Sequence, residues 1–319
     1  MALREREDDH LPLPNGWFAV GWSRELHEGD VKPIHYFGEE LVLFRTRDGH
    51  ARVVDPFCPH LGAHLGHGGR VMGETIRCPF HGWQFDGANG ECTAIPYCDR
   101  IPPRARVRAW ETLERNGMVF VWYHAEGKPP EWEPPLMPEI GHAEWSEPRT
   151  FEMVMPAHVQ DTHENNNDPV HFQFVHRNPQ TPPSELEYFA DGRHYRMVSE
   201  FESVTPFGNF QTKLVRDSWG IGLTAVRTVG YPGAGLLMYS STTPIEEKSV
   251  HSRWLLTATK NIVDQFGEEF MNGLTQGVQQ DLPIWTNKVH RARPVLCEAD
   301  AHLAEFRKWT RQFYSQPVA

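Results

Sequence analysis

The chain lacks the features that mark several common classes of protein. Its 319 residues contain no apolar run near the roughly 18 residues that a transmembrane helix requires. Residues 1–10 are charged and polar, which argues against a signal or transit peptide. Only five cysteines are present, and Cys92, Cys98 and Cys297 show no spacing of a disulfide framework. We therefore expect a cytoplasmic protein without a membrane span.

Positive charge and nucleotide-binding motifs are scarce as well. Lysine and arginine together number 31 against 42 aspartates and glutamates, which gives a net charge of −11. No basic stripe with interleaved aromatic residues is visible, so nucleic acid is not an expected partner. The sequence also has no G-x-G-x-x-G motif. Electrons from NAD(P)H would therefore have to arrive through a separate protein.

The residues that are abundant predict a large folded core. Hydrophobic residues make up 39% of the chain, which is enough for one long domain or two ordinary ones. In the front part, residues 41–44 and 51–54 flank an Asp48-Gly49 turn, residues 84–86 and 92–95 flank a second turn, and residues 118–123 form a buried strand. A proline-rich linker follows at residues 129–138. We expect one domain at residues 12–128, a small antiparallel barrel or sandwich, and a second at residues 129–319.

The back part predicts long strands followed by one helix. Candidate strands are residues 194–201, 210–216, 223–231, 236–242 and 252–259. Apolar residues then recur every three or four positions, which predicts one continuous helix of about six turns. These residues are Phe266, Phe270, Leu274, Val278, Leu282, Trp285 and Val289. A sheet folded around such a helix would enclose a deep cavity with apolar walls.

Two cysteine–histidine pairs carry the first chemical signal. Cys58-Pro-His60 and Cys78-Pro-Phe-His81 are separated by residues 61–77, and each lies in a turn rich in glycine and proline. Two thiolates and two imidazoles suit a Rieske [2Fe–2S] cluster, in which one iron takes two Cys and the other takes two His. The same four ligands would also suit a structural zinc site.

The second signal is the motif Asn165-x-x-Asp168-x-x-His171-x-x-x-x-His176. Two imidazoles and one carboxylate form the facial triad of non-haem Fe(II) oxygenases. Residues five apart on a regular helix point about 140° away from each other, so the helix must end or bulge between the two histidines. A polar loop with incidental histidines is the alternative interpretation.

Asp281 is the best candidate for the carboxylate of this triad. It falls on the apolar side of the predicted helix, where an ionised carboxylate must be paired or bound to metal. A salt bridge to Lys288 is the alternative. A competing pair of histidines, His158 and His163, has the same spacing but lacks the N-x-x-D prefix.

These motifs resemble the terminal oxygenases of the Rieske non-haem iron family. The similarity is carried further by the strings CPHLGAHLGHGG, CPFHGWQFDG, NGMVFVWYHAE and QDLPIWTNK. Within that family the chain is most similar to the group of cholesterol 7-desaturases and 3-ketosteroid 9α-hydroxylases. The resemblance favours a Rieske cluster over zinc. It implies an α+β fold, with an N-terminal all-β Rieske [2Fe–2S] domain followed by a helix-grip catalytic domain, an antiparallel sheet around a long helix.

The resemblance also implies the role of each motif residue. Cys58 and Cys78 would bind one cluster iron, His60 and His81 the other, and His171, His176 and Asp281 the mononuclear Fe(II). Asp168 and Asn165 would be the catalytic residues beside these ligands. Asp168 would bridge metal-bound histidines across the subunit boundary of a homotrimer, in which electrons pass from the cluster of one subunit to the iron of its neighbour. A helix N-cap, with Pro169 following, is an alternative role that Asp168 can fill at the same time.

The implied activity is that of an oxidoreductase, a monooxygenase or desaturase that uses O₂ and electrons from a ferredoxin or ferredoxin reductase. The expected reaction is hydroxylation or desaturation of a steroid or sterol C–H bond, in steroid and lipid metabolism. Two alternatives stay open: a Rieske oxygenase for an aromatic acid or N-methyl compound, and a Rieske-type electron carrier without oxygenase activity. A carrier would have no need of the long back half.

Two further expectations concern binding surfaces. The substrate cavity should be lined by apolar side chains, namely Leu223, Val226, Leu237, Met238, Phe172 and Phe174. The locally basic segment with Arg100, Arg104, Arg106 and Arg108 follows the cluster motifs and is a candidate docking site for an acidic electron donor. A charged, solvated strand edge is the alternative interpretation of this segment.

Overall fold

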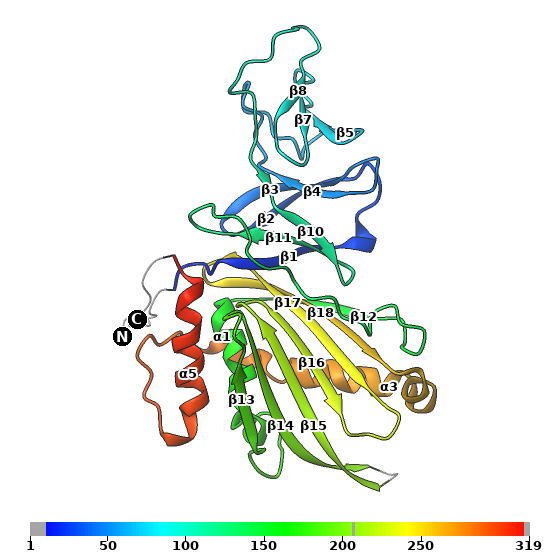
Figure 1. The fold of residues 1–319 in the computed structure, drawn as a ribbon, viewed down its shortest axis with the longest axis vertical. Helices are drawn as coiled ribbons and strands as arrows, with labels where there is room; N and C mark the ends of the chain where they lie inside the picture. Colours follow the sequence, from blue (N-terminus) through cyan, green and yellow to red (C-terminus); the bar gives the residue numbers. More distant parts are fainter. Residues whose placement is uncertain (1–10, 206–207, 316–319) are drawn as a thin grey trace, which may run out of the picture. The chain divides into compact units, whose positions relative to one another are not determined.

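The computed structural model describes residues 11–205 and 208–315, which divide into two compact units. The N-terminal unit is Trp17–Glu133, and the C-terminal unit combines residues 11–16 with residues 134–315. Figure 1 shows the strands and helices of each unit. Within the described residues, no helix combines the length and the apolar character needed to cross a lipid bilayer.

The N-terminal unit is built from three antiparallel sheets, in the orders β1-β11-β10, β2-β3-β4-β9 and β5-β6-β7-β8. The strands are β1 Gly16–Trp22, β2 Val31–Tyr36, β3 Glu39–Arg45, β4 Ala51–Val54, β5 Arg70–Met72, β6 Thr75–Arg77, β7 Gln84–Asp86, β8 Cys92–Ala94, β9 Ala109–Trp110, β10 Thr112–Arg115 and β11 Met118–Tyr123, with a short 3₁₀ turn η1 at Ser23–Glu25. Both predicted hairpins are confirmed: β3 pairs with β4 and β7 pairs with β8. Gly49, in the first turn, has a φ of 87°, which glycine adopts without strain.

The C-terminal unit contains one seven-stranded antiparallel sheet in the order β12-β18-β17-β16-β15-β14-β13. Its strands are β12 Arg149–Met155, β13 Ser184–Tyr188, β14 His194–Thr205, β15 Gly208–Trp219, β16 Leu223–Val229, β17 Leu236–Glu246 and β18 Ser249–Ala258. All five predicted strands are present as β14 to β18. The two edge strands, β12 and β13, were not predicted; most of their side chains are exposed or only partly buried, so neither segment forms a continuous apolar run.

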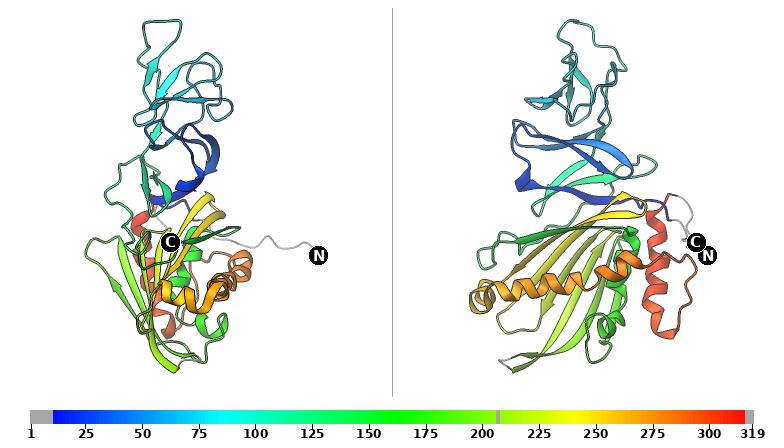
Figure 2. Two further views of the ribbon diagram at one scale, coloured as in Figure 1. Left: turned by 90° about the vertical axis from the view of Figure 1, so that its right-hand side faces the viewer. Right: turned by 180° about the vertical axis from the view of Figure 1, so that it is seen from behind.

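Helices complete the C-terminal unit. They are α1 Val159–Glu164, α2 His171–Phe174, α3 Lys260–Gln279, α4 Leu282–Asn287 and α5 Ala301–Thr310, with 3₁₀ turns η2 Asn165–Asn167, η3 Glu298–Asp300 and η4 Arg311–Phe313. Both views in Figure 2 show α3 crossing one face of the sheet. Met271 of α3 packs there against Leu236 of β17 and Leu256 of β18. The predicted α+β class, with an all-β unit before a sheet-and-helix unit, is confirmed.

The prediction of one continuous helix over the apolar stripe is wrong. Helix α3 ends at Gln279 and α4 begins at Leu282, with Asp281 between them. The physical reason is Pro283, whose missing N–H cannot bond to the carbonyl four residues earlier. Gly267, with a φ of 65° and a ψ of −157°, interrupts α3 a second time. Val289 lies beyond α4, and the side chain of Phe270 lies outside the described residues.

Candidate functional site

The two cysteine–histidine loops have the same backbone design. In each, the cysteine N–H donates to the carbonyl five residues on, at 2.9 Å for Cys58 and 2.8 Å for Cys78. Gly62 and Gly82 donate back to the cysteine carbonyls, at 2.9 and 3.2 Å. Both glycines have a φ of 75°, a backbone conformation that residues other than glycine rarely adopt. The repeated glycine–proline turns that the sequence indicated are therefore two copies of one loop.

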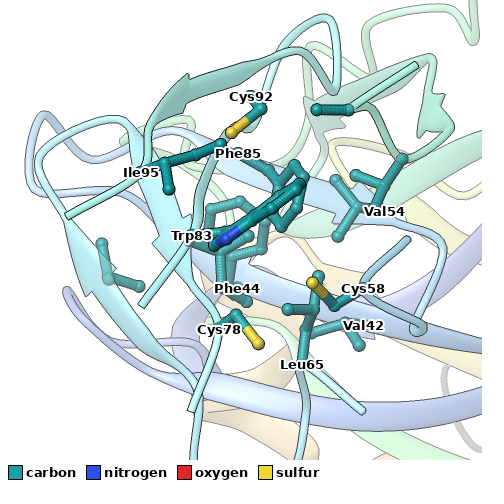
Figure 3. Close-up of a cluster of buried hydrophobic side chains, with 14 residues drawn as sticks. Val42, Phe44, Val54, Cys58, Leu65, Cys78, Trp83, Phe85, Cys92 and Ile95 are labelled. Carbon is teal, nitrogen blue, oxygen red and sulfur yellow. The ribbon is translucent and has the colours of Figure 1, made fainter. Parts of the chain in front are cut away.

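These loops bring two thiols and two imidazoles together. Cys58 and Cys78 are buried at one side of the apolar core of the unit, and Figure 3 shows Cys92 well apart from them. Burial, with the adjacent Cys78 thiol contributing, raises the pKa of Cys58 to about 11. The rings of His60 and His81 are 4.7 Å apart.

This set of donors fits a metal cluster. The Nδ1 atom of His60 is buried and has no hydrogen-bond partner among the described residues. A buried imidazole nitrogen left unpartnered costs free energy unless a ligand uses it. The Cys58 thiol, which burial keeps protonated, would lose its proton to a metal, because metals bind the thiolate form of cysteine. The His60 ring also stacks on Trp83 at 4.7 Å, which fixes its orientation.

The second set of candidate ligands lies in the C-terminal unit. Helix α2 begins at His171 and ends at Phe174, so the chain turns before His176, and the two imidazole rings lie 5.1 Å apart. Arg177, with a φ of 59°, completes the turn. One ligating atom each from His171, His176 and Asp281 lies within 4.8 Å of the other two. Helix α2 therefore ends between His171 and His176, as the five-residue spacing of these histidines required.

Both imidazoles are held by hydrogen bonds from Nδ1. His171 Nδ1 donates to the backbone carbonyl of Asp168, and His176 Nδ1 donates to Gln280 Oε1 at 2.9 Å. A hydrogen bond on one ring nitrogen fixes the tautomer and leaves the other nitrogen for a metal. The Nε2 atom of His176 accordingly lies 3.5 Å from Asp281 Oδ2.

The electrostatics of this triad suit a divalent cation. Burial lowers the pKa of His171, so its imidazole is neutral and able to ligate. Burial also acts to lower the pKa of His176, but Asp281 and Gln280 outweigh it and raise that pKa. Asp281 is itself buried, and its Oδ1 atom has no partner in the described part of the chain. Two imidazoles and one partly unpartnered carboxylate fit Fe(II).

The alternative partner for Asp281 lies elsewhere. Lys288 Nζ is 3.3 Å from Asp161 Oδ1 and 3.2 Å from Glu164 Oε2. These two carboxylates could also form a metal site with His290, but the lysine ammonium already lies between them. Lys288 therefore pairs with these two buried carboxylates and is not the partner of Asp281.

The competing histidines serve the fold. His158 caps α1, its Nδ1 accepting from the N–H of Gln160 at 3.1 Å. His163 Nε2 accepts from the backbone N–H of Gly222 at 3.1 Å, and burial lowers its pKa to about 4. The two rings therefore bond to different partners, and neither joins the cation-binding triad.

Asp168 caps the turn that leads into α2, although the N-cap residue of that helix is Val170 and not Asp168 as predicted. Its Oδ1 atom accepts from the N–H groups of Val170, at 2.9 Å, and His171, at 3.2 Å. Among the described residues none donates to Oδ2, and the side chain is half-buried. Asn165 lies three residues earlier in η2 and lines the cavity described next.

A cavity of about 590 Å³ adjoins the triad inside the C-terminal unit. Gly273, Leu274, Gly277 and Val278 of α3 form one side. The sheet forms the other side with residues at alternate positions of its strands, including Thr212, Leu214 and Arg216, Thr224, Val226 and Thr228, and Met238, Ser240 and Thr242. The sheet wall is therefore rich in hydroxyl groups as well as apolar side chains.

The predicted cavity walls are only partly correct. Val226, Met238 and Phe172 line the cavity, whereas Leu223 and Leu237 are buried away from it. Successive side chains of a strand point to opposite faces, so Leu237 and Met238 cannot both face the cavity. Phe174 is 74% exposed and lines no wall.

Family comparisons cover both units. A family model described as "Rieske [2Fe-2S] domain" matches residues 16–110, and one described as "3-Ketosteroid 9alpha-hydroxylase C-terminal domain" matches residues 121–314. A cholesterol 7-desaturase of Xenopus laevis is 33% identical over 99% of this chain and 75% of its own length. The oxygenase component of a 3-ketosteroid-9-alpha-monooxygenase of Rhodococcus rhodochrous is 30% identical over 94% of this chain and 79% of its own.

Solved structures share the fold at lower identity. Dicamba monooxygenase bound to dicamba superimposes with a TM-score of 0.76 at 18% identity, covering 96% of this chain and 98% of that chain. Pseudomonas putida CBB5 NdmA with caffeine, as a QL mutant, gives 0.76 at 21% identity, covering 92% and 89%. Since the C-terminal family match spans most of the chain and the relatives cover nearly all of it, the protein belongs to the Rieske non-haem iron oxygenases, oxidoreductases that use O₂ and carry a Rieske [2Fe–2S] cluster and a mononuclear iron.

Proposed function

We propose that this protein is the oxygenase component that hydroxylates or desaturates a C–H bond of a steroid or sterol, in steroid and lipid metabolism. The observation that carries the proposal is the cavity of about 590 Å³ that adjoins His171, His176 and Asp281. Relatives at 30% identity or more are a cholesterol 7-desaturase and a 3-ketosteroid monooxygenase component. A simple electron carrier would need neither the triad nor the cavity. A cytoplasmic location is also proposed, supported by five free cysteines.

We assign each cofactor to the group of candidate ligands that lie close together in one unit. The N-terminal domain, proposed as residues 12–128, would hold the cluster through Cys58, Cys78, His60 and His81. The domain at residues 129–319 would hold iron through His171, His176 and Asp281. When bound, the cluster transfers single electrons and the mononuclear iron activates O₂ for attack on a C–H bond.

Residues around the triad are proposed to orient the two imidazoles and to contact the substrate. Asp168 and Gln280 hold the two imidazoles in one orientation through their Nδ1 hydrogen bonds. Leu274 and Val278 of α3 contribute apolar surface that binds a ring system and excludes water. Asn165, on the cavity wall, is proposed to contact the substrate.

A substrate panel tests the proposed function. We expect O₂ consumption by the reconstituted enzyme to be coupled to product with a 3-oxo steroid or a sterol, because a rigid fused-ring ligand fills much of the cavity. Benzoate-type acids and N-methylxanthines should give at least about tenfold lower coupled turnover, since they leave much of it empty. Coupled turnover with the acids or xanthines, and none with any steroid, would contradict the assignment.

Metal analysis of two variants tests the ligand assignment. The wild-type chain should bind about three iron atoms, two in the cluster and one in the triad. His176→Ala should lose the single iron and keep the red-brown colour, whereas His60→Ala should lose the colour and keep the single iron. Iron assay with visible and EPR spectra distinguishes the two. Stoichiometric zinc in a colourless wild-type protein, after iron-replete expression, would refute the cluster.

A homotrimer is the proposed assembly, with Asp168 at the subunit boundary. Apolar side chains are exposed beside the cluster loops: Leu61 at 65%, Phe80 at 61% and Tyr97 at 61%. Exposed apolar groups in one region favour contact with another protein surface. The half-buried Asp168 could accept a hydrogen bond at Oδ2 from a partner subunit while Oδ1 caps the turn before α2.

Asp168→Asn tests this bridging role. The amide oxygen can still cap the turn, so both metal sites should stay filled, while loss of the charged acceptor should lower turnover about 10- to 100-fold. The measurement is oxidation of the pre-reduced cluster by O₂ and substrate in a single turnover. Asp191→Asn is the matched control, because the Asp191 carboxylate also caps two backbone N–H groups. Normal cluster oxidation in the Asp168 variant would exclude a bridge.

The electron donor is proposed to be a ferredoxin or ferredoxin reductase that docks on the basic segment. Arg104 and Arg106 are exposed, alternating with the buried Ala105 and Val107, and Arg100 and Arg108 are exposed as well. Such a row of positive charge would attract an acidic partner and speed its association.

Charge reversal tests the docking segment. Arg104→Glu combined with Arg106→Glu should slow cluster reduction by the donor about tenfold or more at low salt, with the effect shrinking as salt rises. Reduction by dithionite should be unchanged. The control is Arg24→Glu, because Arg24 lies in the turn η1, outside the basic segment. Equal donor rates in the double variant and the wild type would leave the segment as a solvated strand edge.

A further inference from the structure

A short segment after β8, residues 95–97, packs against the second candidate cluster loop. Ile95 is buried in the apolar core of the N-terminal unit. A Cβ atom placed on Gly82, in that loop, would come within 3.0 Å of the Pro96 side chain. The next residue, Tyr97, is 61% exposed. The segment is therefore fixed at its first two residues, and Tyr97 lies at the surface beside the loop.

Tyr97 is joined to the same loop by a hydrogen bond. Its hydroxyl oxygen accepts from the indole Nε1–H of Trp83 at 2.8 Å. Trp83 is buried, and Figure 3 shows its ring among the apolar side chains of the core. A buried indole N–H needs an acceptor, because burial without one costs free energy. Tyr97 supplies this acceptor from the surface of the unit.

The indole of Trp83 also lies against a candidate cluster ligand. Its ring is parallel to the His60 ring within 7°, and the two ring centroids are 4.7 Å apart. Parallel, offset rings at this distance attract each other. The ring of Tyr97 meets the His81 ring edge-on, with 6.5 Å between the centroids. Tyr97 is thus connected to one candidate histidine through Trp83 and lies beside the other.

The stack on His60 favours positive charge on the imidazole. The face of an indole ring is the negative side of its quadrupole. A histidine bound to an iron carries more positive charge when that iron is oxidised. An indole stacked on the imidazole therefore stabilises an oxidised cluster more than a reduced one. This stabilisation requires that the two rings stay parallel, and the hydrogen bond to Tyr97 restricts the movement of the indole.

We propose that Tyr97 is a positioning residue for the cluster. By accepting from Trp83 it keeps the indole stacked on His60, and it thereby lowers the reduction potential of the cluster. The inference rests on the proposed assignment of His60 as a cluster ligand, and it does not depend on the substrate. A hydrogen bond that only satisfied a buried donor would stabilise the fold and leave the reduction potential unchanged.

Tyr97→Phe tests this role, because it removes the acceptor and keeps the exposed aromatic ring. The cluster of the iron-replete oxygenase is titrated with redox dyes and followed by its visible absorption. The equilibrium constant for reduction should rise about threefold, which corresponds to about 28 mV for a one-electron couple. The nitrogen hyperfine couplings of the reduced cluster, measured by pulsed EPR, should change as well, since the His60 ring loses a contact that fixes its orientation.

Tyr123→Phe is the matched control. It removes a hydroxyl group from another ring of the same unit, and that ring stacks on Phe37, with 4.8 Å between the centroids, and not on a candidate ligand. Both the potential and the nitrogen couplings of this variant should equal those of the wild type. A shift as large as that of Tyr97→Phe would show that the loss of any tyrosine hydroxyl in the unit has this effect, and would refute the positioning role.

A second pair of variants tests whether Tyr97 acts through the indole. Trp83→Phe removes the N–H group that Tyr97 accepts. Adding Tyr97→Phe to it should then shift the potential no further, because the two residues form one interaction. Additive shifts would contradict the route through Trp83. If Trp83→Phe does not fold, the comparison of Tyr97→Phe with Tyr123→Phe decides by itself.

The outcomes separate this inference from the ligand assignment. Equal potentials and equal nitrogen couplings in Tyr97→Phe and the wild type would refute the positioning role, even where His60→Ala loses the red-brown colour as expected. A His60→Ala protein that keeps an intact cluster would overturn the ligand assignment, and the positioning role with it.

Discussion

Pro283 ends helix α3 just before Asp281, the third side chain of the candidate triad. Its ring nitrogen cannot donate to the carbonyl of Gln279, so α3 ends there and α4 starts afresh. The short junction places Gln280 and Asp281 together against His176, one accepting from Nδ1 and the other lying near Nε2. Both residues keep right-handed helical backbone angles, so their side chains diverge and reach opposite nitrogens of the one imidazole ring.

The segment that carries the histidines is fixed from two directions. Asn167 donates to the hydroxyl of Tyr195 on β14, and Asn166 donates to Thr224 on β16. On the other side, Glu164 at the end of α1 pairs with Lys288 and with Arg307 of α5. The asparagine-rich stretch thus connects the histidine-bearing segment to the sheet through side-chain hydrogen bonds. The buried ion pairs add a second attachment to the C-terminal part of the chain.

The cavity owes its shape to the different side-chain periods of its two walls. Strands present every second residue to it, so hydroxyl groups of Thr224, Thr228 and Ser240 share one wall with apolar neighbours. Helix α3 presents Gly273 and Gly277, and a Cβ atom added at either would meet nothing within 4 Å. Glycine weakens a helix interior by about 1 kcal/mol relative to alanine, and no protein contact here requires it. The space that these glycines leave is available to a ligand.

The sequence by itself identified both sets of candidate ligands and the five central strands, because the signals were local. The glycine–proline turns at Cys58 and Cys78, the histidine spacing and the long β-prone runs do not depend on distant contacts. Asp281 is buried as its place on the apolar stripe predicted, although it lies between α3 and α4 and not within one continuous helix. Tertiary structure alone decided which face of each strand meets the cavity and that Lys288 pairs with Asp161 and Glu164 and not with Asp281. These are long-range pairings, and residues far apart in the chain carry no local signal of whether folding brings them together.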